Sequence, residues 1–263
     1  MTDRRLFPEA TTAQPKDYAY RISGLVTEAL LRRVVGEHVY GTVLDHVLKP
    51  REVTFVLHVK EYSGNVFVNS GRDDDLWTYL ASCHGLIYLF DPFREHALAQ
   101  LSANGTGDTN RKYLSRTLTY TQLRVPANRR PPGHRLPQHL AVCIAKSDHP
   151  QVVGELDSAG LISVDVKGLE GMPVVTDAQM AFEHLAETET VKMIQTYFVR
   201  RRTRYFATSS IGFFHGRDDR VDPKEYWNFQ DSSDGQPERI RGPIRPINVL
   251  SPLLWIENRV RSQ

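Results

Sequence analysis

Apolar runs of strand length alternate with helix-like segments from about residue 53 onward. The runs 86–92 (LIYLFDP) and 139–148 (HLAVCIAKSD) are apolar up to their polar ends, which is typical of strands buried on both faces of a sheet. The run 52–64 instead alternates, with apolar residues at every second position from 53 to 59. This order predicts an α/β fold of three layers, in which a mostly parallel sheet is flanked by helices.

The helices and the remaining strands are predicted from similar patterns. Three acids open the segment 73–85 and Gly85 closes it, and both are signals for the limits of a helix. A long helix is predicted over 176–202, with Thr176 or Asp177 as its N-cap. We also predict a strand over 17–23, a strand and a turn over 203–213, and helices over 25–35, 93–104 and 243–262. The last helix is expected to pack through Leu250, Leu253, Leu254 and Ile256.

Residues 105–137 interrupt this alternation. The first part of the segment has helical character, but PANRRPPGHRLP is too rich in proline to be regular. A long polar insertion in a compact fold is typical of a surface excursion. We therefore predict a surface insertion over 105–137 within a single domain spanning 1–263.

Composition excludes several classes of protein. The 263 residues carry a formal net charge of only +2, which argues against a general nucleic-acid binder. No run approaches the roughly 18 apolar residues that span a membrane, and the N-terminus has no signal-peptide core. The two cysteines, Cys83 and Cys143, lie in apolar runs and are expected to be small core residues. A cytoplasmic protein is therefore expected.

Three polar groups follow predicted strands, at 61–64 (EYSG), 145–148 (AKSD) and 208–212 (TSSIG). Right-handed crossovers place the carboxyl ends of parallel strands on one side of a sheet, where such folds bind ligands. We therefore expect these groups to contribute to one site.

Over residues 5–255 the chain resembles bacterial small-GTPase-like domains, because these polar groups follow the order of that family's motifs. Lys146 and Asp148 match the family's base clamp. One carboxylate accepts two hydrogen bonds from the ring N–H and the amine of guanine, and adenine has no such donor pair. The lysine stem lies along the base. Ala145 stands where the family often has Asn or Thr.

The resemblance implies further site residues. The turn 208–212, with Ser209 and Ser210, resembles the element whose backbone N–H groups meet the guanine oxygen. Gly64 matches the glycine that meets the terminal phosphate. Glu61, with Thr11 or Thr12, stands where the family holds Mg²⁺, although Glu61 replaces an aspartate and Mg²⁺ is strict about geometry. The implied cofactor is GTP or GDP with Mg²⁺.

The phosphate loop of this family is absent from the sequence. No Gly-x-x-x-x-Gly-Lys-Ser/Thr occurs, and the chain has no Gly-Lys pair. The strand before that loop, expected between 53–59 and 86–90, is missing too. A lost N-terminal piece, a strand or loop supplied by a protein partner, and a rearranged pseudo-GTPase all fit this observation. GTP hydrolysis by this chain alone is not expected.

Plainer interpretations of the same residues remain open. Lys146 and Asp148 fit an ordinary polar strand end, and the fold fits a non-catalytic pseudo-GTPase scaffold or protein-interaction module. The basic run 199–204 (VRRRTR) fits a solvated helix end and requires no nucleic acid. No His-x-x-x-His or Cys-x-x-Cys spacing indicates a metal site, and no Gly-x-Ser-x-Gly indicates a hydrolase.

Overall fold

The computed structural model describes residues 16–26, 51–61, 74–94, 98, 110–164, 172–216, 221, 225–230 and 239–262. The chain forms two compact units, Met1–Tyr79 and Leu80–Gln263. The prediction of a single domain over 1–263 and the predicted helix over 93–104 stay predictions, because many of the residues concerned lie outside the described ranges.

Unit 1 contains a long antiparallel ribbon. Strand β1 (Lys16–Val26) pairs with β2 (Arg51–Glu61), and Tyr20 lies opposite Leu57. Both predicted strands are confirmed as strands. The expectation that the second of them belongs to a mostly parallel sheet is wrong, because β2 pairs antiparallel with β1 and is not a strand of the β3-β4-β7 sheet. The helix predicted over 25–35 starts too early, because Leu25 and Val26 belong to β1; the rest of that segment lies outside the described residues.

Helix α4 (Asp74–Ser82) confirms the helix predicted over 73–85. Two carbonyls near its C-terminus, those of Leu80 and Ala81, accept hydrogen bonds from Nε2 of Gln138, at 3.2 and 3.1 Å. The Gln138 side chain is buried, so this amide satisfies helix-end groups that water does not reach.

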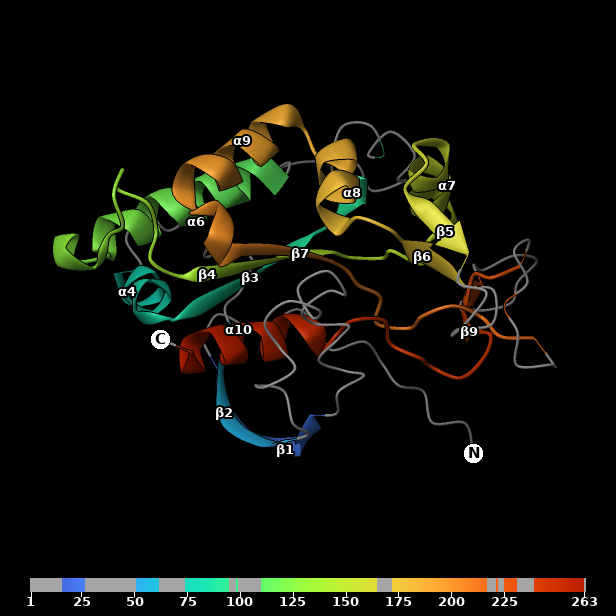
Figure 1. Cartoon of the computed structure of the whole chain (residues 1–263), viewed down its shortest axis with the longest axis horizontal. Coiled ribbons are helices and arrows are strands. Elements are labelled where there is room, and N and C mark those ends of the chain that lie inside the picture. Colours follow the sequence, from blue (N-terminus) through green and yellow to red (C-terminus); the bar gives the residue numbers. More distant parts are fainter. Residues whose placement is uncertain are drawn as a thin grey trace. The chain divides into compact units, whose positions relative to one another are not determined.

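Unit 2 is an α/β fold built on a small parallel sheet (Figure 1). Its strands are β3 (Gly85–Phe90), β4 (His139–Ile144) and β7 (Thr203–Ala207), in the order β3-β4-β7. Every residue of the central strand β4 is buried, as its apolar run predicts. Cys143 of β4 is a core residue, and burial raises the pKa of its thiol to about 12, whereas Cys83 is only half-buried.

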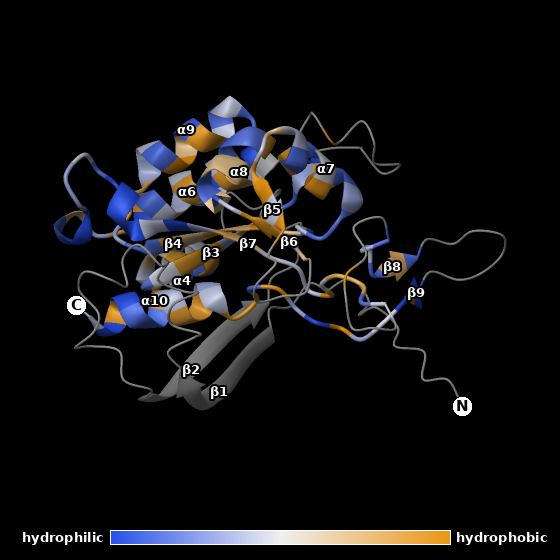
Figure 2. Ribbon diagram, turned by 45° about the vertical axis from the view of Figure 1, so that its right-hand side comes forward, coloured by the Kyte–Doolittle hydropathy of each residue, from blue (hydrophilic) through white to orange (hydrophobic). Residues whose placement is uncertain are grey.

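Helices cover both faces of this sheet. Helices α6 (Asn110–Arg124), α8 (Ala178–Leu185) and α9 (Thr188–Tyr197) lie on one face, and α10 (Ser251–Arg261) lies on the other (Figure 1). Phe182 of α8 contacts Tyr205 and Trp255 of α10 contacts Phe206, so successive residues of β7 point to opposite layers. These helices carry both apolar and polar residues along their length (Figure 2).

Three predictions about helices need correction. The helix predicted over 176–202 is two helices, α8 and α9, because the backbone is extended at Ala186. The N-cap of α8 is Asp177, whose side chain accepts hydrogen bonds from the backbone N–H groups of Gln179 and Met180. The segment 105–137 is more than a surface insertion, since α6 adds Leu114 and Leu118 to the core. The main anchor of α10 is the buried Trp255, whereas Leu250 precedes the helix and is 57% exposed.

Shorter elements complete unit 2. Helix α7 (Pro150–Ser158) follows β4, and β5 (Ile162–Val164) pairs antiparallel with β6 (Pro173–Val175). Near the C-terminus β8 (Phe229–Gln230) pairs with β9 (Arg239–Ile240). Single 3₁₀ turns occur at Pro92–Arg94, Ala127–Arg129 and Arg200–Arg202. Among the residues described, no helix has the length and apolar character that crossing a bilayer requires.

Candidate functional site

The three parallel strands of unit 2 end at the same level. Phe90 of β3 lies opposite Ile144 of β4, which lies opposite Ala207 of β7. The segments that follow these residues are therefore brought together at one edge of the sheet. Two of the three polar groups predicted from strand ends, 145–148 and 208–212, meet there.

The turn after β4 has an unusual backbone conformation at Lys146. Its φ of +55° lies in the left-handed region, which non-glycine residues adopt at a cost of roughly 1–3 kcal/mol. A hydrogen bond from the backbone N–H of His149 to the carbonyl of Lys146 (2.9 Å) closes the turn. A second, from the N–H of Ser147 to the carbonyl of Thr208 (3.1 Å), ties it to the segment after β7. The two predicted motifs are thus joined through their backbones.

The Lys146 side chain reaches across to the end of β3. Its Nζ lies 3.0 Å from Oδ2 of Asp91 and 5.2 Å from the centre of the Phe93 ring. Oδ1 of Asp91 accepts a hydrogen bond from the backbone N–H of Phe93 at 3.1 Å, which fixes the carboxylate. The ion pair and the ring together hold the lysine stem along one wall of the site.

Asp148 is almost withdrawn from water, with 4% of its surface exposed. Desolvation by burial raises the pKa of its carboxyl above the ordinary value of 3.8, while hydrogen bonding from the Ser209 side chain acts in the opposite direction. A carboxylate in such surroundings gains strongly from a ligand that donates hydrogen bonds to it.

The turn after β7 is stabilised by Ser209 and exposes Ser210. Oγ of Ser209 accepts hydrogen bonds from the backbone N–H groups of Ile211 (3.2 Å) and Gly212 (2.8 Å). Ser209 is buried, so its place is behind the site, where it shapes the turn and contacts Asp148. Ser210 lies at the surface of the site.

Gly212 is required by the conformation of this turn. Its φ is +71°, and a Cβ at this position would collide with the carbonyl of Arg245. Gly160 has a similar φ of +69° but open space around it. We expect Gly160→Ala to lower the free energy of unfolding by about 1 kcal/mol, and Gly212→Ala to lower it by at least about 2 kcal/mol. Urea denaturation measures both, and equal losses would show that the contact with Arg245 costs nothing.

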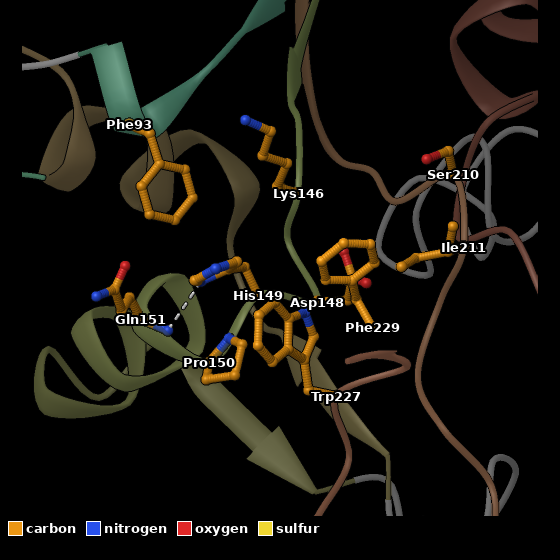
Figure 3. Close-up of a pocket in the computed structure, with 10 residues that line it drawn as sticks. All are labelled: Phe93, Lys146, Asp148, His149, Pro150, Gln151, Ser210, Ile211, Trp227 and Phe229. Atoms are coloured by element: carbon orange, nitrogen blue, oxygen red, sulfur yellow. Dashed lines mark hydrogen bonds between the residues drawn. The ribbon is translucent and has the colours of Figure 1, made fainter. Parts of the chain in front are cut away.

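These elements surround a pocket of about 630 Å³, within the usual size of small-molecule sites. Figure 3 shows Lys146 and Asp148 in the same view as a set of aromatic rings. The ring centres of Phe93 and His149 are 4.5 Å apart, and those of His149 and Trp227 are 4.8 Å apart. Ten residues line the pocket: Phe93, Lys146, Asp148, His149, Pro150, Gln151, Ser210, Ile211, Trp227 and Phe229.

The sequence did not predict Asp91 or the aromatic wall of the pocket, which consists of Phe93, His149, Trp227 and Phe229. Asp91 and Phe93 immediately follow β3, so the rule that parallel strands end on one side of a sheet could have identified them. His149 follows Asp148 directly and caps α7, where its Nδ1 accepts a hydrogen bond from the backbone N–H of Gln151 (3.2 Å). Trp227 gave no such signal, because it lies in a polar segment without periodicity.

The phosphate and metal candidates are not placed in this site. Gly64, Thr11 and Thr12 lie outside the described residues, and of Glu61 only its position at the end of β2 is described. Within the ranges that the structure covers, no group of three or more His, Cys, Asp or Glu side chains could hold a metal ion. The implied Mg²⁺ site therefore stays a prediction.

The fold and the pocket define unit 2 as an α/β unit with a candidate ligand site at the carboxyl edge of its sheet. Comparisons with protein-family models, with curated proteins and with solved structures find no match to the chain. The chemistry of the pocket is therefore the basis for assigning a function.

Proposed function

We propose that unit 2 binds a guanine nucleotide by its base, as a degenerate or incomplete GTPase-like domain. The observation that carries the proposal is the Asp148 carboxylate, which lines the pocket although only 4% of the residue is exposed. In this position it can accept both N–H groups of the guanine edge. An adenine base offers the carboxylate no such pair of donors, and a site of this kind discriminates strongly between the two bases.

The surroundings of Asp148 suit a flat, aromatic ligand. The rings of Phe93, His149, Trp227 and Phe229 line the same pocket, and aromatic rings stack favourably on nucleobases, by about 1–3 kcal/mol each. The Lys146 stem offers a further apolar strip beside them. Lys146 and the turn at Ser209–Ser210, which both contribute to this site, are also positions that the resemblance to GTPase-like domains implies.

The proposal concerns binding and not hydrolysis. The sequence lacks the Gly-x-x-x-x-Gly-Lys-Ser/Thr loop that grips the phosphates and supplies a hydroxyl to Mg²⁺. The contacts proposed here involve the base alone, and no pocket residue is assigned to Mg²⁺. We therefore expect GMP, GDP and GTP to bind with similar affinity, because none of the proposed contacts reaches the phosphates.

Trp227 offers a direct readout, because it lines the pocket whereas Trp77 and Trp255 are buried elsewhere. We expect GMP to change the tryptophan fluorescence and AMP to leave it unchanged at the same concentration. The Trp227→Phe variant should lose the signal while keeping a ring for stacking. Equal responses to GMP and AMP would refute guanine recognition.

The raised pKa of Asp148 predicts a pH dependence of binding. Only the ionised carboxylate accepts both hydrogen bonds, so affinity should increase as pH rises through the pKa of Asp148, which lies above 3.8, and then reach a plateau. The Asp148→Asn variant should lack this increase. GMP titrations across the acidic range, at pH values where circular dichroism shows a folded chain, test this; a binding curve flat in pH for both proteins would contradict it.

A further inference from the structure

A second charged feature lies at the amino end of the sheet, at the opposite end of the strands from the pocket. Three guanidinium groups gather there, those of Arg202, Arg204 and Arg259, which we call the basic cluster. Arg202 closes the 3₁₀ turn before β7, Arg204 is in β7, and Arg259 is in the last turn of α10.

Strand and helix periodicity bring Arg204 and Arg259 to one layer. Arg204 and Phe206 are two residues apart in β7 and so point to the same face, and the Arg204 guanidinium lies 5.7 Å from the centre of the Phe206 ring. The Phe206 ring in turn contacts Trp255 of α10, at 6.2 Å. Arg259 follows Trp255 by four residues, so both lie on the same side of α10.

Arg202 lies in the 3₁₀ turn that precedes β7. Its guanidinium donates a hydrogen bond to the carbonyl of Pro137, just before β4. His139 begins β4, and its ring contacts that of Trp255. Burial, followed by the positive charges of Arg202 and Arg259, lowers the pKa of the His139 imidazole to about 4. Arg202 and Arg259 thus both act on the residue that begins β4.

Among the residues that the structure describes, no carboxylate pairs with the basic cluster, in contrast to two arginines elsewhere in unit 2. Arg241 pairs with Glu225 and Arg261 pairs with Glu257, whereas none of the three guanidiniums forms an ion pair with any carboxylate that the structure describes. Arg204 is also half-buried; burial, followed by the charge of Arg259, lowers its pKa. Holding like charges together in partly desolvated surroundings is unfavourable unless an anion neutralises them.

We propose that the basic cluster is a docking surface for an acidic peptide segment of a partner protein. Guanidinium groups bind carboxylates through paired hydrogen bonds, and three of them match a short run of Asp or Glu. The balanced composition of the chain, 33 basic and 31 acidic residues, favours a short acidic segment over a long polyanion such as nucleic acid, which needs a broad basic surface. This docking surface is independent of the nucleotide pocket.

Fluorescence anisotropy with a labelled peptide of consecutive glutamates tests the proposal on the full chain. We expect binding that weakens with salt and that becomes about tenfold weaker in Arg204→Gln/Arg259→Gln. The matched control is Arg129→Gln, an exposed arginine of the turn Ala127–Arg129, which should bind as the unsubstituted chain does. Arg259→Gln alone removes an exposed group, and should weaken binding even if the double variant folds poorly.

Three results would overturn the proposal. The first is that the glutamate peptide does not bind to the unsubstituted chain. The second is that Arg129→Gln weakens peptide binding as much as Arg204→Gln/Arg259→Gln does. The third is that a single-stranded oligonucleotide of the same charge binds more tightly than the peptide. The last result would assign the basic cluster to nucleic acid instead. Calorimetry with GMP on the same variants should show unchanged nucleotide binding.

Discussion

Asp148→Asn is expected to weaken guanine-nucleotide binding by at least about 100-fold, because two hydrogen bonds to a buried carboxylate are each worth about 1.5–3 kcal/mol. An asparagine amide offers one acceptor and one donor in place of two acceptors. Xanthine carries an oxygen where guanine has its amine, so the variant should bind xanthine nucleotides instead. Calorimetric titration of the variant with GDP and with xanthosine diphosphate measures both effects.

The matched control for this substitution is Asp157→Asn, the same chemical change at an exposed position of α7 outside the pocket. It should leave GDP binding unchanged. The folded state should tolerate Asp148→Asn, since the raised pKa means that folding disfavours the ionised form of this carboxyl. The variant should therefore unfold at the same temperature as the original chain or higher. A variant that binds GDP normally would contradict the role given to Asp148.

Phe182→Ala is expected to cause the largest loss of stability, about 3–5 kcal/mol. The Phe182 side chain is fully buried, and its ring centre lies 5.0 Å from that of Phe90 and 5.3 Å from that of Tyr205. Its removal leaves a cavity between α8 and the sheet. Urea denaturation followed by circular dichroism measures the loss.

Met180→Ala is the control, because Met180 lies in the same helix but is 55% exposed. We expect it to change the free energy of unfolding by less than about 0.5 kcal/mol. Similar losses for the two variants would mean that α8 does not pack on the sheet through Phe182.

The sheet of unit 2 was largely predictable from the sequence. Continuous apolar runs identified β3 and β4, and the polar residues after the predicted strands correctly indicated that 145–148 lies beside 208–212. Both conclusions rest on local rules: a strand buried on both faces has no polar alternation, and parallel strands end on one side. The coarse α/β architecture is accordingly confirmed, whereas the resemblance to GTPase-like domains stays a proposal.

The features that the sequence did not predict depend on tertiary contacts. Helix propensity continues through 176–202, yet the chain turns at Ala186 so that α8 and α9 can each pack on the core. Trp227 and Phe229 lie in a polar segment, and only the folded chain brings them to the wall of the pocket. The left-handed conformation of Lys146 is likewise set by the turn around it and not by residue preference.

Calorimetric titration of the purified chain with GDP and with ADP, in the presence and absence of Mg²⁺, tests the central claim most directly. If Asp148 and the aromatic wall read the base, GDP will bind and ADP will not, and Mg²⁺ will have little effect because the proposed contacts do not involve the phosphates. Equal affinity for the two nucleotides, or binding of neither, would contradict the account.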